Sequence, residues 1–265
     1  MTIRIVNRIA TSAALAVTCT AFAQFDREGQ QATGYIEIGG GAATVTNGQG
    51  NWSGAYLRGS YGYPNQDILN YEVRAAKRFG EDGVYFGVLY SHFFKPDLYA
   101  SFGVASSTKG FFFPGVRVDA SISKIWGEKK DFVTTLGTTY YRARDTYHDW
   151  AGFLDLTYYA GPVIFQAGTR YNVSSPGSVK SWSGYGAVTY NKPKDVMLTF
   201  RYGGGREAYL PLGGTLTNVD FASNTYSVNL RKWINQEWGF NANYEWYDNP
   251  SYKRNGFEIG IFRDF

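Results

Sequence analysis

The sequence has few of the residues from which soluble active sites are commonly built. Its 265 residues include one cysteine, Cys19, and two histidines, His92 and His148. There is no His-x-x-His motif and no dense group of carboxylates, so we expect no metal site. Neither of the two Gly-Gly-Gly triplets is followed by the Lys-Ser/Thr pair of a phosphate loop. We therefore expect no cofactor.

A strong charge of one sign and long apolar runs are also missing. The chain has 26 basic and 22 acidic residues, which does not favour nucleic acid as a partner. No segment approaches the roughly 18 consecutive apolar residues of a membrane-spanning helix. What the chain does have is tyrosine, phenylalanine and glycine, with a mean hydropathy of −0.31. This composition is typical of transmembrane β-barrels, and a soluble periplasmic β-sandwich is the competing class.

The first residues predict a secretory signal peptide. Arg4 and Arg8 precede an apolar stretch at 9–17, and Ala21-Phe22-Ala23 forms an A-x-A cleavage site. Cleavage there removes Cys19, so the mature chain has no disulfide framework. We expect a signal peptide at 1–23, a short periplasmic segment at 24–33 and a single folded domain at 34–265.

That domain alternates between apolar and polar positions in stretches of about ten residues. In one stretch, Leu69, Tyr71 and Val73 share one face, whereas Glu72 and Arg74 share the other. We predict an all-β fold, a transmembrane up-and-down antiparallel β-barrel of about 14 strands, with 12 possible. The barrel is expected to close because no strand edge can remain unpaired in lipid. The expected strands are 34–46, 52–63, 68–79, 84–93, 98–106, 116–126, 132–144, 147–160, 163–171, 179–190, 196–206, 224–233, 238–247 and 257–265.

The C-terminus resembles the sorting signal of bacterial outer-membrane barrels. Glu258, Gly260 and the terminal Phe265 match its pattern, whereas Arg263 stands where the pattern has an apolar residue. The resemblance implies recognition by the barrel-assembly machinery and a location in the outer membrane of a Gram-negative envelope. Outer-membrane lipid and lipopolysaccharide would then surround the barrel. An ordinary amphipathic edge strand is the alternative interpretation.

The charged residues of the predicted strands fall on the face opposite the apolar one. On a lipid-facing surface each would cost several kcal/mol, so we expect them in the lumen. They could bias the passage of solutes, or they could form ion pairs that fill and close the barrel. No constriction loop is evident. The expected lumen-lining residues are Glu37, Arg58, Glu72, Arg74, Arg78, Arg117, Asp119, Asp155, Arg170, Arg201, Arg231, Glu245 and Glu258.

Several junctions resemble the YaiO family of outer-membrane barrels. They are the segment Tyr159-Ala-Gly-Pro-Val-Ile164 between two strands, the glycine-rich strand end at 201–206, and Asp248-Asn249-Pro250 before the last strand. The likeness in strand order extends from about Trp52 to Phe265. It implies an outer-membrane barrel and brings no catalytic residues. Related barrels occur beside periplasmic helical repeats in surface-polysaccharide systems, and this chain has no such repeat region.

Aromatic residues near strand ends predict interfacial belts at the two membrane surfaces. They are Trp126, Tyr159, Tyr190, Trp233 and Trp238.

The two histidines are the remaining candidates for chemistry. His148 lies near Asp145 and Asp149 at a predicted outer loop, where a His/Asp pair could serve a rim hydrolase. A solvated acidic turn is the simpler interpretation, so we expect no enzyme. Neighbouring strand positions point to opposite faces, so Ser91 cannot form a local dyad with His92.

The leading functional hypothesis is a passive, porin-like pore for small polar or saccharide-like solutes. A non-conducting structural or surface-interaction barrel, linked to surface-polysaccharide systems, is the alternative, and a rim hydrolase is a third.

Overall fold

The computed structural model describes residues 33–48, 50–63, 66–144, 147–209 and 219–265. The expected signal peptide at 1–23, nearly all of the segment at 24–33 and part of the connection expected between the strands at 196–206 and 224–233 lie outside these residues. Within them, no helix is long and apolar enough to cross a membrane.

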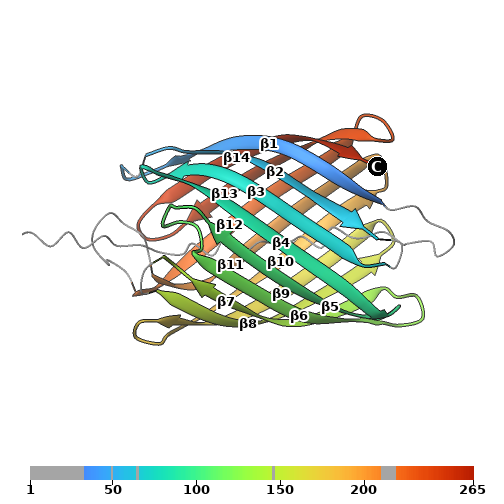
Figure 1. The fold of residues 1–265 in the computed structure, drawn as a ribbon, viewed down its shortest axis with the longest axis horizontal. Coiled ribbons are helices and arrows are strands. Elements are labelled where there is room, and N and C mark those ends of the chain that lie inside the picture. The colour runs from blue at the N-terminus through green and yellow to red at the C-terminus, as the bar shows by residue number, and fades with distance from the viewer. Residues whose placement is uncertain (1–32, 49, 64–65, 145–146, 210–218) are drawn as a thin grey trace, which may run out of the picture.

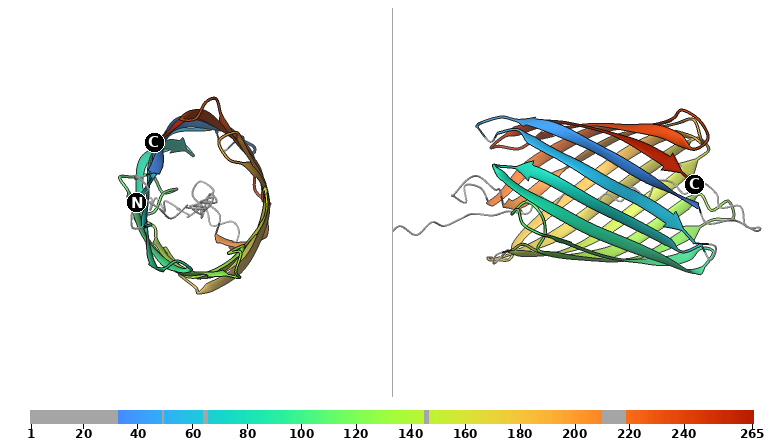
Figure 2. Two further views of the ribbon diagram at one scale, coloured as in Figure 1. Left: turned by 90° about the vertical axis from the view of Figure 1, so that its right-hand side faces the viewer. Right: turned by 45° about the horizontal axis from the view of Figure 1, so that its top comes forward.

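Fourteen antiparallel strands form one closed barrel, with each strand paired to its neighbours in sequence and the last paired to the first. The strands tilt across the barrel wall (Figure 1), and the view along the axis shows a closed oval ring (Figure 2). The prediction of a 14-stranded up-and-down barrel is confirmed. The strands are β1 (Thr33–Val45), β2 (Trp52–Gly62), β3 (Ile68–Arg78), β4 (Glu81–Lys95), β5 (Leu98–Ser107), β6 (Val116–Trp126), β7 (Phe132–Arg142), β8 (His148–Ala160), β9 (Val163–Ser175), β10 (Val179–Lys192), β11 (Val196–Tyr209), β12 (Val219–Trp233), β13 (Trp238–Asp248) and β14 (Lys253–Asp264).

The seam between β1 and β14 closes the ring. Its register runs from Tyr35 opposite Asp264 to Val45 opposite Arg254. Beyond the paired residues, Gly34 and Phe265 exchange two backbone hydrogen bonds of 2.9 Å. The seam is therefore hydrogen-bonded as continuously as the rest of the wall, as a hydrocarbon environment requires.

The burial pattern is the reverse of that in a soluble protein. Large apolar side chains such as Ile38 (66% exposed) and Leu136 (61%) point outward from the wall, whereas Glu37 (1%) points inward and is buried. An apolar exterior around a polar interior matches a barrel that is surrounded by lipid.

The turn between β3 and β4 lies earlier than predicted. Phe79 and Gly80 have positive φ values of 53° and 80°, so they form the two-residue turn that suits the twist of a hairpin. β4 consequently begins at Glu81, and the expected start of this strand at residue 84 is wrong.

The last outer loop is shorter than predicted, because β14 begins at Lys253 rather than at Phe257. The Asn249 side chain accepts hydrogen bonds of 2.8 Å from the backbone N–H groups of Ser251 and Tyr252. This side-chain capping holds a tight turn, which lets the strand start four residues earlier.

The aromatic belt is only partly as predicted. Trp126, Tyr190 and Trp238 are exposed on the outer face. Trp233 instead lies on the inner face, where its Nε1–H donates to Asp264 at 2.8 Å. Tyr159 alternates with the outward-facing Tyr158 and so belongs to the inner face as well. Position near a strand end suggested the belt, but the period of two decides the face.

Candidate functional site: the barrel lumen

The thirteen charged residues expected in the lumen all lie on the inner face, in alternation with outward apolar residues. They form two groups. One follows the seam over β1–β3 and β12–β14, and the other lies across the ring on β6, β8, β9 and β11. Charged groups therefore face each other across the lumen.

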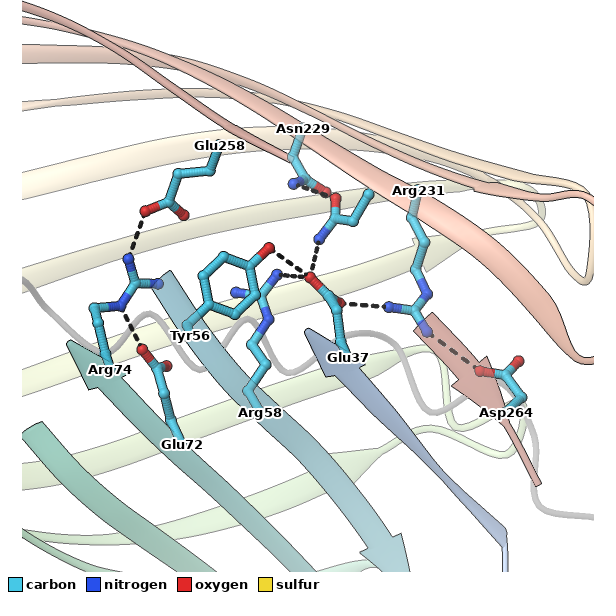
Figure 3. Close-up of polar contacts among 10 residues, drawn as sticks. Glu37, Tyr56, Arg58, Glu72, Arg74, Asn229, Arg231, Glu258 and Asp264 are labelled. Atoms are coloured by element: carbon cyan, nitrogen blue, oxygen red, sulfur yellow. Dashed lines mark hydrogen bonds and ion pairs between the residues drawn. The ribbon is translucent and has the colours of Figure 1, made fainter. Parts of the chain in front are cut away.

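Glu37 is the centre of the first group (Figure 3). Its Oε1 accepts hydrogen bonds from Tyr56 at 2.8 Å, Arg58 at 2.6 Å and Asn241 at 3.2 Å, and its Oε2 pairs with Arg231 at 3.2 Å. We call these five residues the Glu37 cluster. They come from β1, β2, β12 and β13, so one carboxylate joins strands from both sides of the seam.

The Glu37 cluster continues toward the C-terminal end of the barrel through Arg231. This guanidinium also pairs with Asp264 at 3.2 Å, and its Cζ lies 3.4 Å from the centre of the Phe262 ring. Phe262 is fully buried and packs edge-on against Trp233. The inward face of the last strand is thus packed against the charges at the seam.

Missing side chains make room for the cluster. A Cβ on Gly39 would lie 2.5 Å from the Tyr56 hydroxyl, and one on Gly260 would lie 2.6 Å from the same oxygen. Tyr56 can therefore lie across β1 and β14 only because both positions are glycine. Gly260, expected as part of the sorting signal, consequently has a packing role in the folded barrel.

Further from the C-terminal end, Arg74 joins two carboxylates. It contacts Glu72 at 2.6 Å and Glu258 at 2.5 Å (Figure 3). Arg58 and Arg74 also lie against the Tyr56 ring, at 4.6 and 4.9 Å from its centre. The seam side of the lumen is therefore extensively ion-paired.

The opposite wall is less completely paired. Arg117 forms a bidentate pair with Asp119 at 2.7 and 2.8 Å, and Thr139 donates to the same carboxylate. Arg170 donates to the Thr139 hydroxyl at 3.1 Å and forms no ion pair with a described residue. Arg117, Thr139, Asp149 and Arg170 line a small hollow in this wall.

Arg201 lies on the same wall, with its guanidinium 3.7 Å from the centre of the Tyr185 ring and no ion pair among the described residues. Tyr185 is hydrogen-bonded to Asp155 across Gly168. A Cβ on Gly168 would lie 2.0 Å from Asp155 Oδ1 and 2.4 Å from the Tyr185 ring, so this glycine is also required by a close approach.

A phenylalanine turn at the end of the lumen away from the C-terminus is the feature that the sequence analysis missed. Phe111, Phe112 and Phe113, between β5 and β6, are all buried and pack against Tyr85 and Phe79. The sequence feature that could have indicated this turn is the run of three consecutive phenylalanines between a glycine and a proline. Such a run is unlike a solvated loop, so this turn folds onto the inner wall.

Arg78 lies among the aromatic groups of this end. Its Cζ is 4.9 Å from the Trp52 ring centre and 5.5 Å from that of Phe112, and Arg254 lies 4.8 Å from the Trp52 ring. Arg254 is paired with Glu245. The charge and the aromatic groups here are parts of one packed layer.

His148 and Asp149, expected side by side, lie on opposite faces of the wall. His148 shares the outer face with Trp150 and contacts Tyr140 at a ring-centre distance of 6.4 Å, whereas Asp149 takes the inner face. Asp145 lies outside the described residues. His92 contacts the buried Asp67 at 3.0 Å through its Nδ1, a pairing that the sequence analysis did not identify. The described residues contain no group of His, Cys, Asp or Glu that could hold a metal ion.

Comparison with known proteins agrees with this geometry. A family model described as the YaiO membrane beta barrel domain matches residues 33–210. A search among curated proteins found no significant match. Several solved structures share the fold. One is described as a bacterial polysaccharide outer membrane secretin, with a TM-score of 0.56 and 10% identity over 88% of this chain and 98% of that one. An anion-selective porin from Comamonas acidovorans gives a TM-score of 0.51 and 8% identity over 89% and 99%.

A third similar structure is OmpT of Vibrio cholerae with loop L8 deleted, at a TM-score of 0.51 and 11% identity over 89% and 99%. At these identities the likeness concerns the fold alone. The family model covers more than half of the chain, and its expected resemblance is thereby confirmed. The chain belongs to the YaiO family of membrane β-barrels and is a protein of the outer membrane.

Proposed function

We propose that this barrel is a passive pore for small polar or saccharide-like solutes. The observation that supports the proposal is the ring of polar groups inside the closed wall, present on the seam side and on the side across from it. A barrel of 14 strands is wider than the eight-stranded barrels whose interiors side chains just fill.

The balance of charge in the lumen supports uncharged solutes. Seven of the thirteen charged residues expected there are arginines and six are carboxylates, and most are already paired. Such a lining offers hydrogen-bond donors and acceptors without a strong field of either sign. Sugars, which are polar and uncharged, suit it better than ions do. One of the similar structures, a bacterial polysaccharide outer membrane secretin, also supports a saccharide-like solute.

We also propose that the protein is not an enzyme. General-base catalysis needs a carboxylate that orients an imidazole within hydrogen-bonding distance. The outward direction of His148, with Asp149 inward, works against such a pair at that site.

Single-channel recording in planar bilayers tests the pore directly. The folded barrel should give discrete conductance steps with weak preference between cation and anion, and liposomes that contain it should swell in isotonic sugar. A correctly folded barrel that gives no conductance and no swelling would contradict the proposal.

The second candidate is a non-conducting structural or surface-interaction barrel. The phenylalanine turn supports it, because that turn places buried aromatic side chains inside the end of the lumen away from the C-terminus. The same recordings separate the two functions, because a closed lumen gives no current whether or not the outer loops bind a partner.

A further inference from the structure

One sector of the outer rim has exposed positive charges that no carboxylate among the described residues pairs. Among the described connections the longest, between β5 and β6, lies at the end away from the C-terminus, and longer loops face outward in such barrels. We therefore place the turns from β7 to β8 and from β9 to β10, which share that end, at the outer side. Arg142, Arg144 and Lys180 lie at these turns and are exposed. None of them forms an ion pair with a described residue. We call these three residues the basic rim patch.

Elsewhere on the same rim, the basic side chains lie beside carboxylates. Lys109 pairs with Asp82 at 2.8 Å, Arg206 with Asp220 at 2.5 Å and Lys253 with Asp248 at 3.8 Å. Lys77 stands directly opposite Asp82 in the β3–β4 register. Local carboxylates thus balance the cations elsewhere, and the basic rim patch is left with net positive charge.

The strand register brings the patch together on the lipid-facing side. Arg142 stands opposite His148, and both Trp150 and Lys180 stand opposite Val173. Below these residues lies an aromatic belt, in which Tyr140 packs on Trp150 at 4.8 Å and Tyr171 on Trp182 at 5.6 Å. Aromatic belts mark the level of the lipid head groups. The cations therefore lie just above that level, on the outward side of the wall.

We propose that the basic rim patch binds the phosphate groups of lipopolysaccharide in the outer leaflet. Guanidinium and ammonium groups are the usual protein partners of phosphate, and the patch spans four strands, wide enough for the two separated phosphates of one lipid head group. The acyl chains would lie against the apolar face below, with Trp150 and Trp182 at the boundary. This surface is outside the barrel, so the proposal is independent of whether the lumen conducts.

The test measures binding of purified lipid A with both phosphates to the folded barrel in detergent, in the presence of EDTA. The variant Arg142→Gln/Arg144→Gln/Lys180→Gln should bind roughly a hundredfold more weakly, because each cation near a lipid surface contributes about 1 kcal/mol. The matched control is Lys77→Gln/Lys109→Gln/Lys253→Gln, which removes three charges from the same rim and should bind like the native chain. Heat-dependent electrophoretic mobility confirms that each variant is folded.

Three further ligands identify what is recognised. Fully dephosphorylated lipid A, phosphatidylglycerol and inorganic phosphate should each bind far more weakly than lipid A with both phosphates. Equal binding of the dephosphorylated lipid would show an acyl-chain site, equal binding of phosphatidylglycerol a general anionic-lipid site, and equal binding of phosphate a free-anion site. Each of these results, or undiminished binding by the patch variant, would overturn the proposal. Asp145 carries the nearest acidic side chain in sequence, and Asp145→Asn should leave lipid A binding undiminished.

Discussion

At the scale of single residues, Glu37 makes the contacts on which the seam most depends. Replacing it with glutamine removes the charge that faces Arg58 and Arg231. Breaking a buried pair in this way leaves an uncompensated cation, so we expect the free energy of unfolding to fall by about 3 kcal/mol. Urea unfolding of the barrel in lipid vesicles measures the change.

Glu237→Gln is the matched control for that substitution. Glu237 pairs with Arg263 at 3.0 Å, but both side chains are more than half exposed. Exposed pairs contribute little, so the control should lose well under about 1 kcal/mol. Equal losses in the two variants would show that burial of the Glu37 cluster adds nothing to its strength.

A rim carboxylate gives a pH-dependent prediction. In the turn after β10, hydrogen bonds from Lys192 and then Lys232 lower the pKa of Asp195 from 3.8 to about 2. Folding thus favours the ionised form. Its contribution to stability should be complete above about pH 4 and disappear as the pH falls toward 2.

The measurement compares melting temperatures of the native chain and Asp195→Asn as the pH is lowered. Their difference should be constant from pH 7 to pH 5 and should shrink below pH 4. A difference that persists unchanged at pH 2 would exclude these hydrogen bonds as its cause.

The face of each charged residue could be predicted from sequence, but its partners could not. A period of two places Glu37, Arg58 and Arg231 inward, because alternation requires it. That Arg231 reaches Glu37 from β12 depends on strand register and on the space left by glycines, which no local pattern encodes. Trp233 was wrongly assigned to the outer aromatic belt because its position near a strand end was given more weight than the alternation of faces along the strand.

At the scale of elements, substitution of Gly260 can show whether this residue of β14 is needed for packing of the barrel or for recognition by the assembly machinery. A methyl group there meets the Tyr56 hydroxyl and Glu37 Oε1, at 2.6 and 2.9 Å from the added carbon. Gly260→Ala should therefore destabilise the barrel by about 1–3 kcal/mol in refolding experiments that contain no assembly machinery. Adding Tyr56→Phe, which removes the closest atom, should restore part of that loss.

The control is Gly186→Ala on the outer face of β10, where the nearest atom to an added Cβ is 4.0 Å away. It should fold normally. If Gly260→Ala also refolds with native stability and fails only in cells, its role belongs to recognition rather than to packing.

The phenylalanine turn between β5 and β6 gives a second prediction at this scale. Phe112 is 2% exposed and packs on both neighbouring phenylalanines. Phe112→Ala should lower the free energy of unfolding by about 3 kcal/mol and raise single-channel conductance, because the turn loses the ring that packs against its other two phenylalanines and beside Arg78. Phe102→Ala, on the outer face, should leave the conductance unchanged.

At the scale of the whole molecule, the fold was predictable because only helices and closed barrels can satisfy all backbone hydrogen bonds inside a lipid bilayer. Alternating strands, polar inside and apolar outside, must close in a ring, and the 14 strands follow from counting them. What fills the ring was not predictable. The packing of Phe111 to Phe113 against Tyr85 depends on how a loop bends, and a loop has no periodic pattern to read.

The charge balance of the lumen gives a prediction for the whole pore. Arg170 and Arg201 form no ion pair with described residues, so their charges are the ones most available to a passing ion. Arg170→Glu/Arg201→Glu should shift the reversal potential in a salt gradient toward cation selectivity. Arg263→Glu at the rim, outside the lumen, should shift it much less, and equal shifts would place the selective charges elsewhere.

The pairing of β1 with β14 has a consequence for how the protein is made. Thr44 pairs with Asn255, almost the entire length of the barrel sequence away, so no N-terminal fragment can pair this edge of the first strand. Contacts between residues so far apart in sequence form slowly, because closing a very large loop costs conformational entropy before the contact contributes any stability. A truncated chain that lacks β14 would leave the edges of β1 and β13 unpaired, and unpaired strand edges promote aggregation.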